Sequence, residues 1–410
     1  MKIACIGGGP AGLYLSILMK LRDPAHEVTV YERGKASAMS GWGVTFGSRL
    51  QNRLHAEDPE SAELIGAGAF CWRDQIVHMR GEQVVAHGGE AYNISRRHLI
   101  DIFTARALSL GVRIDYGTEV TGLDQLTEAD LIVAADGVNS KVRDAVGDFQ
   151  TETVSGENKY IWLGSDKVFE AFNFLFAETA HGWIWAHAYG IDAESSTFIV
   201  ECSTRTWAGL GFDTMSTSEA LPILERLFSE HLAGQRLIGE LGDGSTAHWL
   251  NFKTITNRHW HSGNIALVGD CARTAHFAVG MGTTLAIEDV MLLADLLHQE
   301  ADLEAALVSY ERQRKSELAA TLAEAHCSAR WLENLDRYTH LTPQKFGLLF
   351  YARRSPFIAV LPPRLSCLLR QASRKIKAVD AVRHSIAPPA KAIYNRRKLM
   401  QRKREQSYNS

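Results

Sequence analysis

The stretch MKIACIGGGPAGLYLSILMKLRDPAHEVTVYE, residues 1–32, has the order of a buried strand, a G-x-G-x-x-G turn, a helix and a second strand that ends in an acid. Gly7 allows the tight turn, Gly9 leaves room for a pyrophosphate near the backbone, and Gly12 lets helix and strand pack closely. Glu32, twenty residues past Gly12, can accept hydrogen bonds from ribose hydroxyls. These features predict an ADP-binding βαβ unit, and the alternative is a tight turn without a ligand. The motif does not distinguish FAD from NAD, and it names no reaction.

The composition is that of a globular protein, with 410 residues of which 46% are hydrophobic and 22% are charged. This length accommodates two domains, or one large domain with an insertion. We expect no transmembrane helix, because no run of 18 apolar residues occurs, and no leader peptide, because the chain goes straight into a strand. The six cysteines contain no C-x-x-C pair, which argues against a metal site or a disulfide framework and favours a reducing, cytoplasmic location.

The net charge of −3 is unevenly distributed along the chain. Residues 374–410 contain eleven Lys and Arg against Asp380 and Glu405, so this tail carries +9 and the rest of the chain −12. Two interpretations of the tail stay open: a solvated, partly helical extension, or a segment that contacts a CoA phosphate, a carrier protein or a membrane surface. Residues 346–369, which are apolar with interspersed Arg, suit a membrane surface. Nucleic-acid binding is not expected, because no recognition module accompanies the charge.

Residues 155–250 differ in residue composition and pattern from the segments on either side. Short runs within them alternate and are rich in aromatic and β-branched residues, as in an antiparallel sheet. Residues 1–154 and 251–325 are interpreted as one nucleotide-binding domain, and residues 326–410 as a C-terminal helical region with the basic tail. We therefore predict an α/β fold, in which a Rossmann-like domain carries an inserted antiparallel β-sheet domain that binds the substrate.

Two further motifs follow predicted strands. Residues 136–143 read DGVNSKVR, which fits a D-G-x-x-S-x-x-R pattern; alone, this is equally an Asp-Gly turn that caps a helix. Gly269-Asp270 follows an apolar strand, and Gly280-Met281-Gly282 opens the next helix. In this order the three motifs resemble those of the class A flavoprotein monooxygenases, the aromatic hydroxylases related to para-hydroxybenzoate hydroxylase.

The resemblance implies that the nucleotide-binding domain is an FAD-binding domain of the glutathione reductase type. It implies that Glu32 binds the FAD ribose, that Asp136 lies near the pyrophosphate, and that Asp270 binds the ribityl or ribose part. Arg96, in RRHL, matches a helix start that reaches the flavin in this family; the alternative is an exposed helix charge. The start of the helix after Asp270 is expected to bring N–H groups to the flavin edge. Its residues are Gly280, Gly282 and Thr283.

Several segments narrow the resemblance to a subgroup that includes the hydroxylase of violacein biosynthesis and the salicylyl-CoA 5-hydroxylases. These segments are GWGV at 41–44, NKYIWLG at 158–164, AHAY at 186–189, STFIVEC at 196–202 and GTT at 282–284. The chain departs from the commonest family pattern at Arg273, at His276-Phe277 and at Thr284. The subgroup implies a small aromatic or indolic substrate, free or carried on CoA or a carrier protein.

The family reaction consumes NAD(P)H as co-substrate together with O₂. NAD(P)H reduces FAD, the reduced flavin and O₂ form a C4a-hydroperoxide, and the distal oxygen passes to an electron-rich ring carbon. The protein must exclude water, and a base that deprotonates a phenol or amine makes the ring more reactive. Two other classes stay open: a flavin oxidoreductase without oxygen insertion, and a flavin-binding sensor without turnover.

Residues 183–189, WIWAHAY, supply the candidate substrate wall. Residues two apart share one face of a strand, so the large side chains here form one mostly aromatic face. The alternative is a buried contact between the sheet and another domain. His187 and His276 are the candidate bases or hydrogen-bond partners, although a lone His in a strand is more often structural. The wall residues are Trp183, Trp185, His187 and Tyr189, with Trp42 and Tyr160 as further candidates.

Overall fold

The computed structural model describes residues 1–35, 41–241, 244–370 and 372. The chain divides into two compact units, Met1–Ala359 and Val360–Ser410. The basic tail at residues 374–410 lies outside the described residues. Within the described ranges, no helix has the length and apolar character needed to cross a membrane, and no disulfide joins the cysteines.

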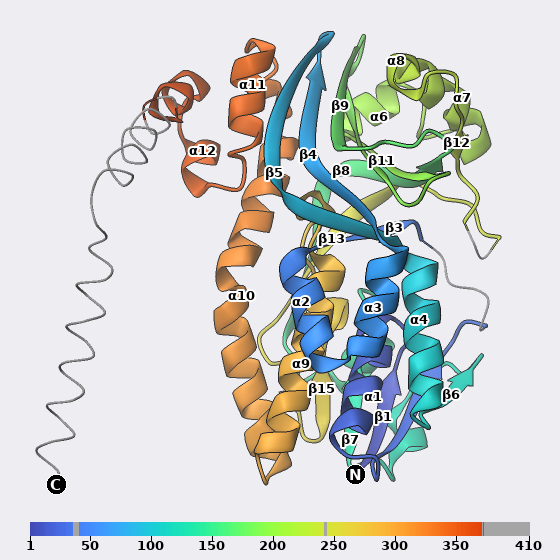
Figure 1. Ribbon diagram of the computed structural model, residues 1–410. Helices are drawn as coiled ribbons and strands as arrows, with labels where there is room; N and C mark the ends of the chain where they lie inside the picture. Colours follow the sequence, from blue (N-terminus) through green and yellow to red (C-terminus); the bar gives the residue numbers. More distant parts are fainter. Residues whose placement is uncertain (36–40, 242–243, 371, 373–410) are drawn as a thin grey trace, which may run out of the picture. The chain divides into compact units, whose positions relative to one another are not determined.

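The nucleotide-binding part is built on a six-stranded sheet in the order β14-β15-β7-β1-β2-β6. The short edge strand β14 runs antiparallel, and the other strands are parallel. The central strands are apolar and buried, as is typical of a parallel sheet covered by helices (Figure 1). The bounds are β1 (Lys2–Ile6), β2 (Glu27–Glu32), β6 (Arg113–Tyr116), β7 (Leu131–Ala134), β14 (His261–Ser262) and β15 (Ile265–Leu267).

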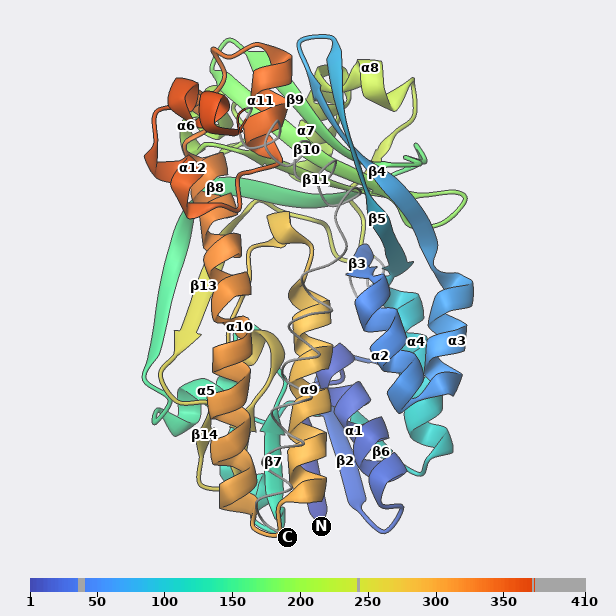
Figure 2. The ribbon, with the colours of Figure 1, turned by 60° about the vertical axis from the view of Figure 1, so that its left-hand side comes forward.

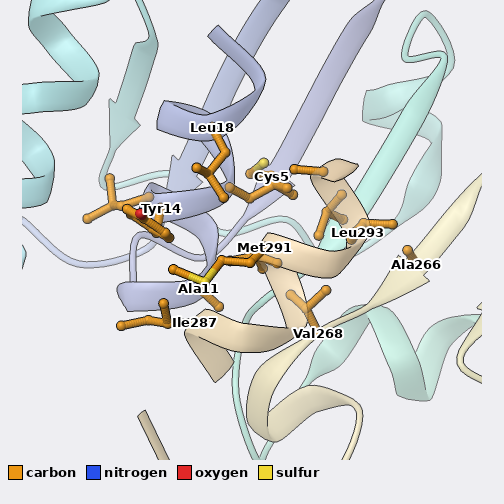
Figure 3. Packing of buried hydrophobic residues seen from close by; sticks show 14 of the residues in the cluster. Cys5, Ala11, Tyr14, Leu18, Ala266, Val268, Ile287, Met291 and Leu293 are labelled. Carbon is orange, nitrogen blue, oxygen red and sulfur yellow. The ribbon is translucent and has the colours of Figure 1, made fainter. Parts of the chain in front are cut away.

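Helices α1 (Pro10–Arg22), α4 (Arg96–Ser109) and α9 (Gly282–Gln299) share one hydrophobic core with this sheet. Figure 3 shows Ala11 and Leu18 of α1 and Met291 of α9 in this core, with the strand residue Cys5 between the two helices. This arrangement confirms the predicted α/β, Rossmann-like fold class.

Two glycines of the opening motif are required by the backbone. Gly7 has a φ of +110°, in the region that favours glycine. A Cβ added to Gly12 would lie 2.1 Å from the carbonyl oxygen of Gly7, so no larger residue fits at this crossing of helix and strand.

The second sheet has nine strands, in the order β12-β8-β11-β10-β9-β4-β5-β3 with β13 paired to β8. Most come from the segment that the sequence predicts as β-rich. Strands β3, β4 and β5 precede α4 in the chain and are not predicted; β4 joins the sheet through a parallel pairing with β9. The domain boundaries stay a prediction. The bounds are β3 (Gly43–Gly47), β4 (Phe70–Met79), β5 (Glu82–Ser95), β8 (Thr151–Ser165), β9 (Phe172–Thr179), β10 (Gly182–Gly190), β11 (Ser196–Cys202), β12 (Leu237–Ile238) and β13 (Leu250–Asn257).

The two faces of this larger sheet have different neighbours. In β10, Ile184, Ala186 and Ala188 belong to a hydrophobic core that includes Leu224 of α7. Helices α6 (Thr204–Gly209), α7 (Thr217–Leu227) and α8 (Ser229–Leu232) lie near one another in Figure 1. The odd-numbered residues of β10 therefore point to the opposite face.

Helix α10 (Leu303–Glu333) runs beside α9, and α11 (Pro343–Phe350) packs on β4 and β5 (Figure 2). Phe346 and Phe350 are buried and contact Phe176 of β9. Within residues 346–369, which the sequence analysis considers for a membrane contact, Phe346 and Phe350 are thus inside the protein. The remaining bounds are α2 (Ser48–Glu57), α3 (Pro59–Gly68), α5 (Lys141–Val146) and α12 (Pro356–Val360).

Candidate active site

The sequence motifs meet at the carboxyl edge of the parallel sheet. Strands β1, β2, β7 and β15 end there: Glu32 is the last residue of β2, and Gly7, Asp136 and Asp270 follow the other three strands. A Cβ added to Gly7 would lie 3.1 Å from the Cα of Asp136, which shows how closely the first two motifs approach. This edge is where open α/β sheets bind their ligands.

The glycine-rich turn leaves room for a phosphate group. Gly9 caps α1 without a side-chain hydrogen bond, and a Cβ added to it would meet no atom within 4 Å. Glu32 accepts from the N–H groups of Gly8 and Gly34, each at 2.7 Å, so its carboxylate is fixed at the end of β2. Its remaining lone pairs are available to a ribose.

Asp136 caps a helix and keeps one oxygen open. Its Oδ2 accepts from the backbone N–H of Lys141 at 2.8 Å, which is the capping role given above as the alternative. Its Oδ1 is buried and has no hydrogen-bond partner in the described part of the chain. Arg143 donates to the carbonyl of Cys271 at 3.3 Å and so joins this segment to the Gly269-Asp270 turn.

Asp270 lies on a turn that is rigidly held. Gly269, with a φ of +62°, donates its N–H to Asp289 at 3.0 Å, and its carbonyl accepts from Arg273 at 3.1 Å. Asp270 itself is exposed, yet burial against the surrounding protein raises its pKa, an effect that the charges of Arg273 and Arg96 oppose. A carboxyl that combines exposure with such a shift faces a cleft.

A buried ion-pair network stands behind this turn. Asp289 of α9 accepts from Arg273 Nη2 at 2.9 and 3.0 Å and from Arg314 Nε of α10 at 2.6 Å. Arg314 also pairs with Glu288 at 3.2 Å. Each of these four side chains is at most 7% exposed. The network ties the Gly269-Asp270 turn to two helices, and its only indication in the sequence is the departure from the family pattern at Arg273.

The start of α9 presents open backbone N–H groups. Its N-cap, Met281, makes no side-chain cap hydrogen bond, and a Cβ added to Gly282 would meet nothing within 4 Å. Gly280 has a φ of +65° and accepts from the Thr45 hydroxyl at 2.9 Å, which fixes the approach to the helix. Thr283 is half-buried in the first turn. Such an N-terminus favours negative charge.

Arg96 stands between the ADP end and the flavin end of the candidate site. Its pKa is lowered by burial and raised by the charges of Asp270 and Glu32, which places it near both carboxylates. The guanidinium makes no hydrogen bond or ion pair with any residue that the structure describes. The free guanidinium, the open Asp136 oxygen and the uncapped helix starts fit a dinucleotide with an anionic flavin edge.

We expect Asp270→Ala to lose most of its FAD, because it removes an exposed carboxylate at this edge whose charge acts on Arg96. FAD occupancy is measured from the ratio of absorbance at 450 nm and 280 nm after desalting. Asp302→Ala, which removes an exposed acid at the start of α10, serves as the control. A variant purified with full FAD occupancy would contradict the assignment.

The predicted wall residues share one face of β10 and are all buried. Trp185, His187 and Tyr189 are 2%, 1% and 4% exposed. Tyr189 stacks on Phe172 with ring centroids 4.7 Å apart, and Trp185 lies among the aromatic side chains under α11. Trp183, at the far end of the strand, lies 5.3 Å from the guanidinium of Arg80 and apart from the others.

Glu201 lies in this face as well, and the sequence motifs do not predict it. Glu201 of β11 pairs in register with Trp185 and Tyr160, and only 1% of it is exposed. It accepts from Asn158 Nδ2 at 2.8 Å and from Trp185 Nε1 at 3.1 Å, and His187 Nε2 lies 3.5 Å from its Oε2. The available signal was an acid inside an otherwise apolar strand.

The charge state of this pair follows from its contacts. Burial raises the pKa of Glu201, but the hydrogen bonds and the nearby imidazoles outweigh it, and the net pKa is lowered. Burial lowers the pKa of His187, which stays neutral. Glu201 is therefore a buried carboxylate within an aromatic face.

Tyr160 and His276 lie near this carboxylate at the border with the cofactor edge, whereas Trp42 lies further along β8. Burial, Asp270 and Glu201 together raise the pKa of Tyr160 to about 12. The Phe277 ring lies 4.8 Å from Tyr160 and 5.7 Å from His187, so it covers the buried histidine. Trp42 packs on Gly164, and its Nε1 is buried without a partner in the described residues.

His276 has a defined tautomer. Its Nδ1 accepts from the Ala278 N–H at 3.2 Å, which leaves the ring proton on Nε2. Burial lowers its pKa to about 4, so the imidazole is neutral at working pH. The ring stacks on Phe277 at 4.3 Å, and Phe252 contacts it in a tilted orientation at 4.7 Å. It is half-buried, whereas His187 is sealed.

We expect stability to fall as the pH drops from about 6.5 to about 4, in part through His276. An unfolded histidine titrates near 6.5, and the folded pKa is about 4. The unfolded state therefore binds more protons in this window, so the contribution is lost towards low pH and fully present above about 6.5. His276→Gln should remove on the order of 2 kcal/mol of the difference in unfolding free energy between pH 4.5 and 7.5, measured in urea. An unchanged pH dependence would contradict this.

Comparison with known proteins agrees with this geometry. Residues 103–325 match a family model described as FAD binding domain. The chain is also 34% identical to a salicyloyl-CoA 5-hydroxylase of a Streptomyces species, over 87% of this chain and 70% of that protein. The chain belongs to this FAD-binding family.

Two further relatives match over most of the chain. The protodeoxyviolaceinate monooxygenase of Chromobacterium violaceum is 30% identical over 92% of this chain and 100% of that protein. The 3-hydroxy-4-methyl-anthranilyl-[aryl-carrier protein] 5-monooxygenase of Streptosporangium sibiricum is 31% identical over 82% of this chain and 90% of that protein. The chain is thus an FAD-dependent aromatic monooxygenase, and the resemblance read from the sequence is confirmed.

The fold has counterparts among solved structures. A tetrameric 2-methyl-3-hydroxypyridine-5-carboxylic acid oxygenase superposes with a TM-score of 0.69 at 20% identity, over 88% of this chain and 96% of that one. This likeness concerns the fold of the family and not its substrates.

Proposed function

We propose that this FAD-dependent monooxygenase uses NAD(P)H and O₂ to hydroxylate a phenol, an arylamine or an indole whose ring is carried on CoA or a carrier protein. The named relatives include enzymes for a salicyloyl-CoA and for an anthranilyl group on an aryl-carrier protein. The observation that carries the proposal is the buried carboxylate of Glu201, set in an aromatic face beside the cofactor edge.

The cofactor edge accounts for FAD. Glu32 and Asp136 would hold the ADP end, Asp270 and Arg96 the middle, and the start of α9 the flavin. Bound FAD, when reduced by NAD(P)H, supplies the activated oxygen. Exclusion of water falls to the aromatic side chains that cover the larger sheet, such as Phe277 above Tyr160.

The polar groups of the face prepare the ring for oxidation. His276, neutral and with its proton on Nε2, can donate a hydrogen bond to the hydroxyl or amino group of the ring. Glu201 supplies the negative charge that draws the proton of that group away from the ring, and this makes the ring more nucleophilic. His187, sealed behind Phe277, positions Glu201. Tyr160, whose pKa is raised to about 12, stays protonated and can donate as well.

The test is a substrate panel with FAD-loaded enzyme. Aryl-CoA thioesters, the corresponding free acids and indolic compounds are assayed for stimulated NAD(P)H oxidation, with the products analysed by mass spectrometry. The proposal expects one class to give close to one hydroxylated product per NAD(P)H. Stimulated oxidation that yields only H₂O₂ across the panel would favour a flavin oxidoreductase without oxygen insertion. Absence of any stimulation would favour a flavin-binding sensor.

A cytoplasmic location and an anion or membrane contact through residues 374–410 stay part of the proposal. The tail carries eleven Lys and Arg and lies outside the described residues. Sedimentation with anionic vesicles of the full chain, against a chain ended at residue 372, tests the membrane contact. Equal sedimentation of the two chains would contradict it.

A further inference from the structure

A cavity of about 540 Å³ lies next to the candidate wall, between two helix ends and the larger sheet. Its size is that of a site for a drug-sized ligand. Residues of α2, α9 and α10 line it together with residues of strands β3, β4, β5 and β9, and the three helices stand below the larger sheet in Figure 2. The lining includes three aromatic side chains and three arginines: Trp72, Phe172, Phe174, Arg49, Arg353 and Arg354.

One side of the cavity is aromatic and continuous with the wall. Phe172 stacks on Tyr189 at 4.7 Å, and Phe174 meets His187 edge-on at 5.2 Å. The cavity also reaches residues 278–281, the loop between His276 and the start of α9. A ligand whose ring lies against Phe172 and Phe174, which line the cavity and cover the wall, thus has apolar space beside it for a chain attached to that ring.

The other side of the cavity is positively charged. Arg353, only 4% exposed, donates to Ser328 Oγ and to the carbonyls of Phe350 and Ala278, each at 3.0 Å. Arg354 donates to the carbonyl of Val279 at 3.1 Å. Neither guanidinium has a carboxylate within ion-pair distance among the described residues. Burial and the charge of Arg354 lower the pKa of Arg353 to about 9, and the charge of the buried Glu201 only partly opposes this effect.

The acids that line the cavity do not neutralise these two arginines. Glu288 and Glu317 both pair with Arg314, at 3.2 and 2.9 Å. Arg49, whose side chain is 81% exposed, lies 3.5 Å from Glu288 at the mouth of the cavity. A buried charge is unfavourable unless it is paired, so Arg353 and Arg354 leave a place for an anion.

We propose that this cavity binds the phosphate-bearing arm of an acyl thioester, a phosphopantetheine chain, while the attached ring lies on the aromatic face. The inference rests on the proposed function and adds the residues that recognise the carrier. The apolar side suits the pantetheine chain, and Arg353, Arg354 and Arg49 suit its phosphate. Backbone hydrogen bonds fix the two buried arginines in advance, which lowers the entropic cost of binding.

The test measures binding to the FAD-loaded enzyme by calorimetry, without turnover. The probes are CoA, 4′-phosphopantetheine, and pantetheine, which lacks the phosphate. We expect pantetheine to bind about tenfold more weakly than phosphopantetheine, the loss of one charge-assisted hydrogen bond. Arg49→Gln and Arg354→Gln should each weaken phosphopantetheine about three- to tenfold and leave pantetheine unchanged.

Arg113→Gln is the matched control. It removes an exposed arginine of the edge strand β6, whose side chain pairs with Asp115 at 2.8 Å. Equal affinities of phosphopantetheine and pantetheine, or unchanged affinity in Arg49→Gln and Arg354→Gln, would overturn the proposal. So would displacement of bound CoA by NADPH at its KM, which would assign the cavity to the electron donor.

Two further binding experiments distinguish CoA from a carrier protein as the source of the phosphopantetheine group. Tighter binding of a holo-carrier protein than of its apo form assigns the arm to a carrier, and tight binding of free CoA assigns it to CoA; both support the cavity. Failure here is distinct from failure of the proposed function. Efficient hydroxylation of free aryl acids with no phosphate-dependent binding would remove the cavity proposal and leave the hydroxylase.

Discussion

Asp289→Ala is expected to lower the melting temperature on the order of 10 °C, or to prevent folding. The carboxylate is fully buried and binds Arg273, Arg314 and the N–H of Gly269. Its removal leaves two buried guanidinium groups without their central anion, a loss of about 3–5 kcal/mol. Net stabilities are about 5–15 kcal/mol, so this loss is a large fraction of the total.

Asp302→Ala is the comparison for this effect. Asp302 caps α10 by accepting from the Ala305 N–H at 2.9 Å, and it is exposed. Its loss should amount to about 1 kcal/mol. Thermal unfolding of both variants with and without added FAD gives the measurement. If Asp289→Ala melts as close to the wild type as Asp302→Ala does, the network does not support the turn that carries Asp270.

Glu201→Gln is expected to retain FAD and to lower the rate of hydroxylation about 100-fold, the size of a lost acid-base contribution. The Gln amide has one NH₂ group where Glu201 has a carboxylate oxygen, so it can no longer accept from both Asn158 Nδ2 and Trp185 Nε1. The charge that draws the proton from the ring is lost at the same time. NAD(P)H oxidation should continue and yield H₂O₂ in place of product.

The readout is the ratio of hydroxylated product to NAD(P)H consumed, measured beside the FAD absorbance spectrum. Glu178→Gln changes an acid on the neighbouring strand β9 that is 56% exposed, and it should leave the ratio unchanged. His187→Ala should lower the ratio more than it lowers FAD binding. Wild-type coupling in Glu201→Gln would remove the carboxylate from the mechanism.

The cofactor edge could be predicted because its signals are local. Each motif follows an apolar strand, and parallel strands place their carboxyl ends together whatever the length of chain between them. Gly7 and Gly12 are required by the turn and by the helix crossing, which a short sequence window records. The predicted alternation of residues 183–189 likewise fixed which side chains share a face.

The active face could not be predicted in the same way, because it depends on pairings between distant segments. Glu201 meets Tyr160 and Trp185 only through the register of three strands. Phe350 reaches Phe174 from a helix more than 150 residues away in the chain. The hairpin of β4 and β5 carries many exposed side chains and lacks a clear alternation, and its place in the sheet depends on β9.

Labelling with ¹⁸O₂ reports directly whether oxygen is inserted into the aromatic ring. The FAD-loaded enzyme is given NAD(P)H, ¹⁸O₂ and the compound that stimulates NAD(P)H oxidation most, and the product is analysed by mass spectrometry. We expect one ¹⁸O atom in the ring hydroxyl and close to one product per NAD(P)H. An unlabelled product, or labelled H₂O₂ with no hydroxylated ring from any aryl thioester, aryl acid or indole, would contradict this expectation.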